Sequence, residues 1–235
     1  MASTTNTGTC ISLNNVPDSV TNLPTLSYNS TGWGTVKADF INTLLLAHSI
    51  LICAVQEHFQ LQQNLYRLQS GISDQYELFG IPAFKSTQTI SVGRPSGGIA
   101  FFYHKSLNNC ATRITVPNSH RVQGLKLKCT NAESVVFINT YFPTDPGGNQ
   151  IDNTVLLETL QDIKYVMDSC DPNCKIVLLG DLNTDFIRNS SFTNLVVDSP
   201  LRTIYTVCGQ ISSNVISHTV TLGTVMAHKE HFIQC

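Results

Sequence analysis

The sequence has few charged residues and no excess of positive charge. Asp, Glu, Lys and Arg make up 13% of the 235 residues, and the formal net charge is −2. This charged fraction is about half the usual share of a soluble domain. A protein that binds nucleic acid tightly through phosphate attraction alone carries a strongly basic face, so this class is excluded. A nuclease is not excluded, because a bound metal ion can supply local positive charge.

The sequence also lacks the segments that direct a protein to a membrane or out of the cell. Residues 1–15 are rich in Thr, Ser and Asn, with neither a basic nor an apolar stretch, so we expect no signal peptide. The longest apolar stretch, 44–55, contains His48 and is too short to span a bilayer. We therefore expect an intracellular protein, nuclear or cytoplasmic, that has no membrane partner.

The eight cysteines lack the CxxC spacing that is typical of zinc sites. Cys170 and Cys174 are separated by three residues, which only weakly indicates a metal site. Because we expect no export signal, we expect free thiols rather than a disulfide framework.

Hydrophobic periodicity predicts a flexible arm over residues 1–22 and one α/β domain over residues 23–235. Helices are expected over 36–47, 61–68 and around the apolar positions of 155–167, and strands over 24–29, 50–56, 99–103, 122–128, 134–141 and 175–179, with weaker strands at 202–207 and 219–225. The 122–128 strand alternates as a half-exposed strand does. Several strands follow one another directly, which indicates mixed or antiparallel sheets.

One predicted strand ends in residues suited to catalysis. The apolar run 175–179 is followed by Gly180, Asp181 and Asn183. Side chains at positions i and i+2 of an extended segment point the same way, so the acid and the amide are expected to face one reacting atom. Gly180 lets the backbone turn where a side chain would clash.

Three more polar residues lie where apolar strands end, namely Asn29, Glu57 and Tyr141. Strand ends that converge at one sheet edge often form a site. Glu57 and Asn29 offer the oxygen ligands that Mg²⁺ prefers. Asp181 can deprotonate a water, and Tyr141 can donate a hydrogen bond to charge developing on phosphate. The set indicates hydrolysis of a phosphodiester.

Five segments in order carry a resemblance to a known family: residues 27–32 (SYNSTG), 51–58 (LICAVQEH), 93–100 (GRPSGGIA), 138–144 (INTYFPT) and 176–183 (IVLLGDLN). Together they resemble the endonuclease/exonuclease/phosphatase superfamily, also called DNase I-like. The nearest likeness is to the apurinic/apyrimidinic-like endonuclease domain of non-LTR (LINE-type) retrotransposons. The resemblance extends from about Pro24 to Asn194.

This resemblance implies a four-layered α/β sandwich, in which two mixed β-sheets face each other between outer helices. It implies that Glu57 is the main metal ligand, that Asn29 lies near the metal, and that Tyr141 donates a hydrogen bond to phosphate. Asp181 would position or deprotonate the water, and Asn183 would stabilise the transition state. The implied enzyme is an endonuclease that uses Mg²⁺, or Mn²⁺ in its place, to nick DNA. No stable protein partner can be inferred.

The C-terminal segment departs from the family pattern. The family ends with a Ser-Asp-His motif, and the best match here makes His231 the catalytic histidine, with Glu230 as a further metal-site carboxylate in place of the Asp. Ser217 stands where a carboxylate normally orients that histidine. The chain stops four residues after His231, so the last strand is expected to be truncated.

These departures favour an alternative, a catalytically weak or inactive relic of the same domain. A further alternative keeps the fold but acts on a small phosphoester. Asp181 with Asn183 could also form only an Asx-capped turn. His58 is expected to be exposed, and the pair Gly97–Gly98 to permit close packing before a strand.

Overall fold

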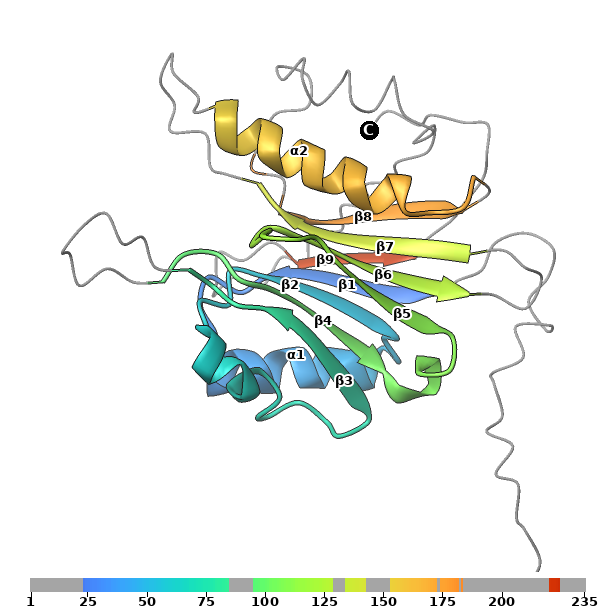
Figure 1. Cartoon of the computed structure of the whole chain (residues 1–235). Helices are drawn as coiled ribbons and strands as arrows, with labels where there is room; N and C mark the ends of the chain where they lie inside the picture. Colours follow the sequence, from blue (N-terminus) through green and yellow to red (C-terminus); the bar gives the residue numbers. More distant parts are fainter. Residues whose placement is uncertain are drawn as a thin grey trace, which may run out of the picture.

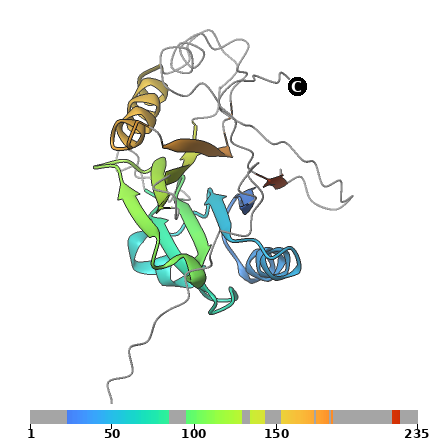
Figure 2. The same ribbon diagram turned by 90° about the vertical axis from the view of Figure 1, so that its right-hand side faces the viewer.

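The structure, a computed structural model, describes residues 23–84, 95–128, 134–142, 153–172, 174–181, 183 and 220–224. Two β-sheets lie face to face between two α-helices, so the described part of the molecule has four layers (Figure 1). Figure 2 gives the same view turned by 90° and shows the helices on opposite outer sides of the sheets. The predicted four-layered α/β sandwich with mixed sheets is confirmed.

The first sheet has the strand order β3-β4-β2-β1-β9. Its strands are β1 (Pro24–Asn29), β2 (Ile52–Gln56), β3 (Tyr76–Ile81), β4 (Ile99–His104) and β9 (Val220–Thr224). Strands β1 and β2 are parallel, and the other neighbours are antiparallel. Helix α1 (Thr35–Ala47) joins β1 to β2, and the 3-10 helix η2 (Gln62–Leu68) precedes β3.

The second sheet has the strand order β5-β6-β7-β8. Its strands are β5 (Ala111–Thr115), β6 (Val122–Lys128), β7 (Ser134–Tyr141) and β8 (Lys175–Asp181). Helix α2 (Asn153–Asp168) joins β7 to β8, which are parallel, and a short 3-10 helix, η3 (Lys105–Leu107), follows β4.

Each sheet therefore contains one strand–helix–strand crossover. The carboxyl ends of parallel strands lie at the same edge of a sheet. Asn29 consequently lies beside Gln56 in the first sheet, and Tyr141 lies beside Asp181 in the second. Because β1 and β2 face β7 and β8, these four strand ends share one edge of the sandwich.

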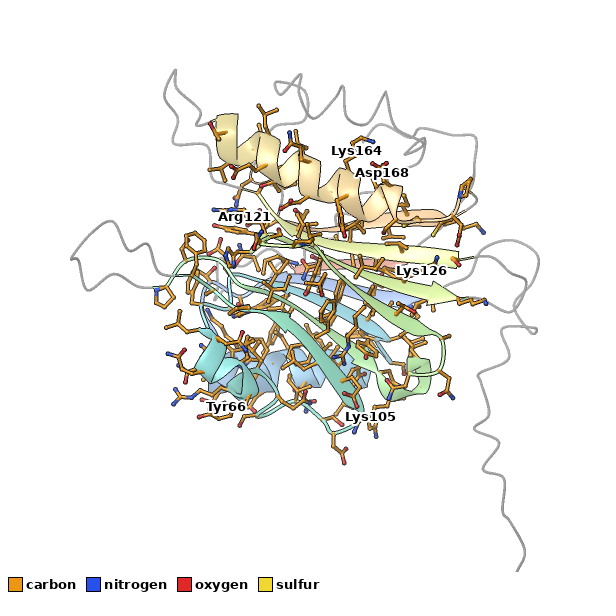
Figure 3. The ribbon with its side chains drawn as sticks, in the orientation of Figure 1. Tyr66, Lys105, Arg121, Lys126, Lys164 and Asp168 are labelled. Carbon is orange, nitrogen blue, oxygen red and sulfur yellow. The ribbon has the colours of Figure 1, made fainter. Side chains whose placement is uncertain are left out.

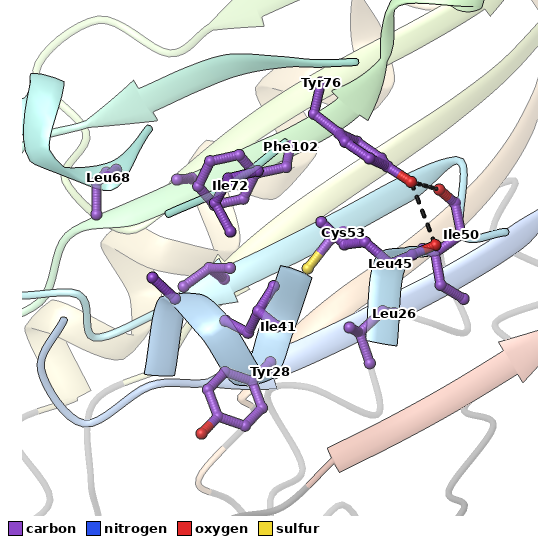
Figure 4. Close-up of a cluster of buried hydrophobic side chains, with 13 residues drawn as sticks. Leu26, Tyr28, Ile41, Leu45, Ile50, Cys53, Leu68, Ile72, Tyr76 and Phe102 are labelled. Atoms are coloured by element: carbon purple, nitrogen blue, oxygen red, sulfur yellow. Dashed lines mark hydrogen bonds between the residues drawn. The ribbon is translucent and has the colours of Figure 1, made fainter. Parts of the chain in front are cut away.

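Three apolar layers hold the sandwich together. Helix α1 buries Ala38, Ile41 and Leu45, three or four positions apart, against the first sheet. Figure 4 shows this layer, in which the Tyr76 hydroxyl donates to the carbonyls of Leu45 and Ile50. A second apolar cluster fills the space between the sheets, and a third lies under α2.

The structure contains two strands that the periodicity did not predict, β3 and β5. Both are edge strands, and β5 is partly or fully exposed along its length, so its sequence lacks a continuous apolar run. The half-exposed character predicted for β6 is wrong, because one face packs on the other sheet and the opposite face on α2. The predicted strand at 202–207 lies outside the described residues.

The described residues include four free thiols, Cys53, Cys110, Cys170 and Cys174. A hydrogen bond from Cys174 is the main cause that lowers the pKa of Cys170 to about 7. Within the described ranges, no three His, Cys, Asp or Glu side chains gather in a group that could hold a metal ion. No helix that the structure describes is long and apolar enough to cross a membrane.

Helix α2 depends on a glycine for its close approach to the second sheet. A Cβ atom at Gly124 of β6 would lie 2.8 Å from Cγ1 of Val166 and 3.0 Å from Cβ of Ile114. We predict that Gly124→Ala lowers the free energy of unfolding by about 1–3 kcal/mol, the usual cost of overpacking. Urea denaturation measures this change.

Gly80→Ala is the matched control for this experiment. A Cβ atom at Gly80, in β3, would have its nearest neighbour at 3.5 Å, an ordinary contact. The control is expected to leave stability nearly unchanged or to raise it slightly, because Gly costs more backbone entropy than Ala. Equal effects of the two substitutions would show that Gly124 has no special packing role.

Candidate functional site

The polar residues at the four strand ends meet across the two sheets. Nδ2 of Asn29 donates to Oε1 of Glu57 at 3.0 Å and to Oδ2 of Asp181 at 2.5 Å. Glu57 follows β2 in the first sheet, whereas Asp181 ends β8 in the second. The two carboxylates therefore lie within hydrogen-bond distance of the same nitrogen, although 124 positions separate them in the sequence (181 − 57).

The backbone turns sharply where it presents Glu57. Gln56 points toward the other sheet, so in a regular strand Glu57 would point away from it. Glu57 instead has a left-handed φ of 53°, which ends β2 and allows its carboxylate to reach Asn29. Left-handed backbone is uncommon for residues other than Gly and gathers at functional sites.

The loop after β1 is fixed against the end of β2. Oδ1 of Asn29 accepts hydrogen bonds from the N–H and the hydroxyl of Thr31, at 2.9 Å and 3.1 Å. The amide of Gly32 donates to the carbonyl of Glu57, and the ammonium of Lys37, on α1, donates to the carbonyls of Ser30 and Thr31. These contacts fix the amide of Asn29 so that its nitrogen faces both carboxylates.

Gly180 is required where β8 approaches β7. Its φ is +141°, and a Cβ atom there would lie 1.9 Å from the carbonyl oxygen of Thr140. Any side chain at this position would push β8 away from β7. The prediction that a side chain would clash here is therefore confirmed, and the close approach places Asp181 beside Tyr141.

The expected alignment of Asp181 and Asn183 along one extended strand is wrong. Strand β8 ends at Asp181, and Asn183 has a left-handed φ of 39°. The backbone N–H of Asn183 donates to Oδ1 of Asp181 at 3.1 Å, which is the Asx turn considered as an alternative. The side chain of Asn183 donates to the carbonyl of Phe142 at 3.1 Å. Asp181 is thus oriented by a hydrogen bond on each of its oxygens, while the transition-state role of Asn183 stays a prediction.

Tyr141 lies on the inner face of the second sheet and is protonated at neutral pH. Burial is the main cause that raises its pKa, and the charge of Glu57 and a hydrogen bond to Glu57 raise it further. The phenol therefore donates its proton toward the Glu57 carboxylate. A protonated phenol is also the form that can donate to a phosphate oxygen.

Arg121 joins the site although the sequence analysis did not select it. Its Cζ atom lies 5.1 Å from the centre of the Tyr141 ring, and Nη1 donates to the carbonyl of Tyr141 at 3.3 Å. Figure 3 shows Arg121 and Lys126 toward opposite ends of β6. Burial lowers the pKa of the guanidinium, and the charge of Glu57 counteracts this. Only the pairing of β6 with β7 reveals this neighbour.

His58 is completely buried, so its predicted exposure is wrong. Its Nδ1 accepts from the N–H of Gln60 at 2.9 Å, and its Nε2 therefore carries the proton shared with the carbonyl of Ile81 at 3.0 Å. A Cβ atom at Gly98 would lie 2.4 Å from this ring, which confirms close packing at that glycine. His58 thus supports the backbone beside Glu57 and does not face the site.

The predicted C-terminal site residues lie outside the described residues. These are His231, Glu230 and Ser217. Their proposed roles stay predictions.

The arrangement suits a hard divalent cation such as Mg²⁺. Glu57 and Asp181 supply carboxylate oxygens, and Mg²⁺ is commonly held by one or two carboxylates with water and substrate phosphate. Asn29 joins the two carboxylates as a donor, because its oxygen is occupied by Thr31. For Asn29 to be a metal ligand as predicted, its side-chain amide would have to rotate so that Oδ1 faces the two carboxylates.

No protein-family profile matches the chain, and no curated protein matches it. Solved structures do match. AP endonuclease LMAP from Leishmania major superposes with a TM-score of 0.50 and 15% identity, over 68% of this chain and 55% of that one. The Xenopus laevis APE2 catalytic domain matches with a TM-score of 0.48 and 16% identity over 68% of this chain and 58% of that one. An AP endonuclease from Archaeoglobus fulgidus matches with a TM-score of 0.48 and 13% identity, over 85% and 86% of the two chains.

The chain thus spans little more than half the length of the first two solved structures. At such low identity the likeness to the Leishmania major enzyme establishes the fold alone, which is DNase I-like. The activity has to be argued from the residues of this chain.

The burial of His58 predicts a specific loss of stability in acid. Burial lowers its pKa from 6.5 to about 4. Between these two values the unfolded chain binds a proton that the folded protein does not, so stability falls as the pH falls from 6.5 toward 4. The contribution of this one group amounts to about 3 kcal/mol.

Urea denaturation of the wild type and His58→Gln at several pH values between 7 and 4 measures this loss. The free energy of unfolding should fall less between pH 7 and pH 4 in the variant, because Gln does not bind a proton. Every other titrating group is common to both proteins. Parallel curves for the two proteins would contradict the assignment of His58 as a buried neutral imidazole.

Proposed function

We propose that this chain is a metal-dependent phosphodiesterase that nicks DNA. The observation that carries the proposal is the bridge from Asn29 to Glu57 and Asp181, which brings two carboxylates from facing sheets together. Beside them lie a protonated phenol, Tyr141, and a guanidinium, Arg121. These are the groups that hydrolysis of a phosphodiester needs.

The residues divide the reaction between them. Asp181, oriented by Asn29 and Asn183, accepts a proton from the attacking water. Tyr141 stabilises negative charge that develops on the phosphoryl oxygens, and Arg121 binds the phosphate of the substrate. Glu57 would hold Mg²⁺, which would supply local positive charge to an anionic substrate. The products would carry a 3′-hydroxyl and a 5′-phosphate.

Two observations support DNA as the substrate. The structure that matches with a TM-score of 0.50 is named an AP endonuclease. The five ordered sequence segments resemble the endonuclease domain of LINE-type retrotransposons, and we propose this class as the nearest relative. The low net charge of −2 agrees with an enzyme that relies on local charge at the site rather than on a basic surface.

Nicking of supercoiled plasmid tests the proposal directly. The wild type is expected to convert supercoiled plasmid to the relaxed form with Mg²⁺ and not with EDTA. Asp181→Ala should lower the rate by at least about a hundredfold, because a general base contributes this much or more. Asp168→Ala, at an exposed carboxylate paired with Lys164 on α2, is the matched control and should nick normally.

Three outcomes would contradict parts of the proposal. Nicking that survives Asp181→Ala would exclude the assigned base. A folded wild type without nicking, but with activity on soluble phosphoesters, would favour a small-molecule phosphoesterase. A folded wild type without either activity would favour the inactive relic.

Arg121 should contribute mainly to substrate affinity. A charged hydrogen bond is worth about 1.5–3 kcal/mol, so Arg121→Gln is expected to raise the KM for DNA roughly tenfold or more. Steady-state nicking at several salt concentrations measures this change. Arg67→Gln is the control, because Arg67 is exposed and contacts only its neighbour Tyr66 among the contacts described. An unchanged KM for Arg121→Gln would restrict Arg121 to supporting the backbone of Tyr141.

A further inference from the structure

A pair of buried amides joins the two sheets directly behind the site. Asn139, on β7, is fully buried and donates from Nδ2 to the carbonyl of Val55 at 3.2 Å and to that of Ala100 at 3.0 Å. Its Oδ1 accepts from Nε2 of Gln56 at 2.8 Å. Gln56 is 1% exposed. One side chain of the second sheet is thus hydrogen-bonded to β2 and β4 of the first.

Both amides lie on strands that end at site residues, one or two positions before the residue concerned. Gln56 immediately precedes Glu57, and Asn139 lies two positions before Tyr141 on the same face of β7. Nε2 of Gln56 also contacts the hydroxyl of Ser27 at 3.3 Å, two positions before Asn29. Strand β7 is hydrogen-bonded to β8, which ends at Asp181. Contacts that fix Asn139 on β7 therefore also fix the backbone of Asp181.

Hydrogen bonds at this place constrain the sheets in a way that the apolar core does not. A cluster of apolar side chains, including Phe101, Leu125 and Phe137, also packs between the sheets. Apolar packing is non-directional and tolerates small displacements when side chains repack. Buried hydrogen bonds are directional, and losing a partner for a buried amide is costly.

We propose that Gln56 and Asn139 are positioning residues that set the distance between Glu57 on one sheet and Asp181 on the other. This inference rests on the proposed phosphodiesterase function. It deepens that function, because the two carboxylates belong to different sheets and only inter-sheet contacts can fix their separation. Neither amide faces the substrate, so both act through the residues that they hold.

The chain offers a matched control in Gln123. This residue lies opposite Asn139 on the neighbouring strand β6 and is also fully buried. Neither polar atom of its side chain has a hydrogen-bond partner in the described part of the chain. Gln123 is therefore a buried amide beside the pair that makes no bond to the first sheet.

The test compares three variants in the plasmid assay, namely Asn139→Leu, Gln56→Met and Gln123→Leu. Each replaces an amide with an apolar side chain of similar size. Misplacing catalytic groups by about 1 Å costs on the order of a hundredfold in rate, so Asn139→Leu should lower kcat by about that factor with little change in KM. Gln56→Met leaves both donations of Asn139 intact and should lower kcat by roughly tenfold. Gln123→Leu should leave kcat and KM unchanged.

Thermal melting of each variant separates positioning from folding. A positioning role requires that kcat falls while KM holds and the melting temperature stays well above the assay temperature. It also requires that Gln56→Met adds little in the Asn139→Leu background, because the two residues share one hydrogen bond. If Asn139→Leu does not fold, Gln56→Met alone decides by the same criteria.

Two results would overturn the inference. Normal kcat in folded Gln56→Met and Asn139→Leu would show that apolar packing suffices to hold the carboxylates. Equal losses of kcat in Gln123→Leu would show that any buried substitution in this layer has the same effect. These results differ from failure of the proposed function, in which the wild type itself would not nick DNA.

Discussion

The structure depends on one amide that joins two carboxylates from facing sheets. Two carboxylates this close repel each other unless donors or a cation lie between them. Asn29 supplies donor hydrogens to both, and Thr31 fixes the direction in which the amide points. Under the proposed function, the same pair of acids would hold a divalent cation, and Asn29 keeps the two carboxylates together for it.

The fold serves this contact by bringing strand ends to a single edge. Each sheet has one parallel pair joined by an outer helix, and the two pairs face each other with their carboxyl ends at the same side. Close backbone approaches refine the positions. Gly180 allows β8 to approach β7, and Gly98 makes room for the ring of His58 behind Glu57. The buried amides of Gln56 and Asn139 add directional bonds between the sheets.

Much of the scaffold could be predicted from the sequence. The apolar runs that became β2, β4 and β7 are continuous because both faces of these strands are covered, and the helical spacing of 36–47 became α1. Strands β3 and β5 were missed because edge strands need no continuous apolar run. The exposure of β6 was misjudged because the sequence does not reveal that α2 covers its outer face. His58 was judged exposed because its two backbone partners come from the loop that follows it and from the end of β3.

The sequence by itself determined which chemical groups stand at the ends of the strands, because hydrophobic runs and turn residues are local properties of the chain. The clash that makes Gly180 necessary is with the carbonyl oxygen of Thr140 on β7, so that need comes from the pairing of the two strands. Only the tertiary structure decided that Arg121 joins Tyr141, that Asn183 closes an Asx turn, and that Asn139 reaches across to the other sheet. These outcomes depend on contacts between segments far apart in the chain, and hydrogen-bond partners of that kind are fixed by how the two sheets pack rather than by residue spacing.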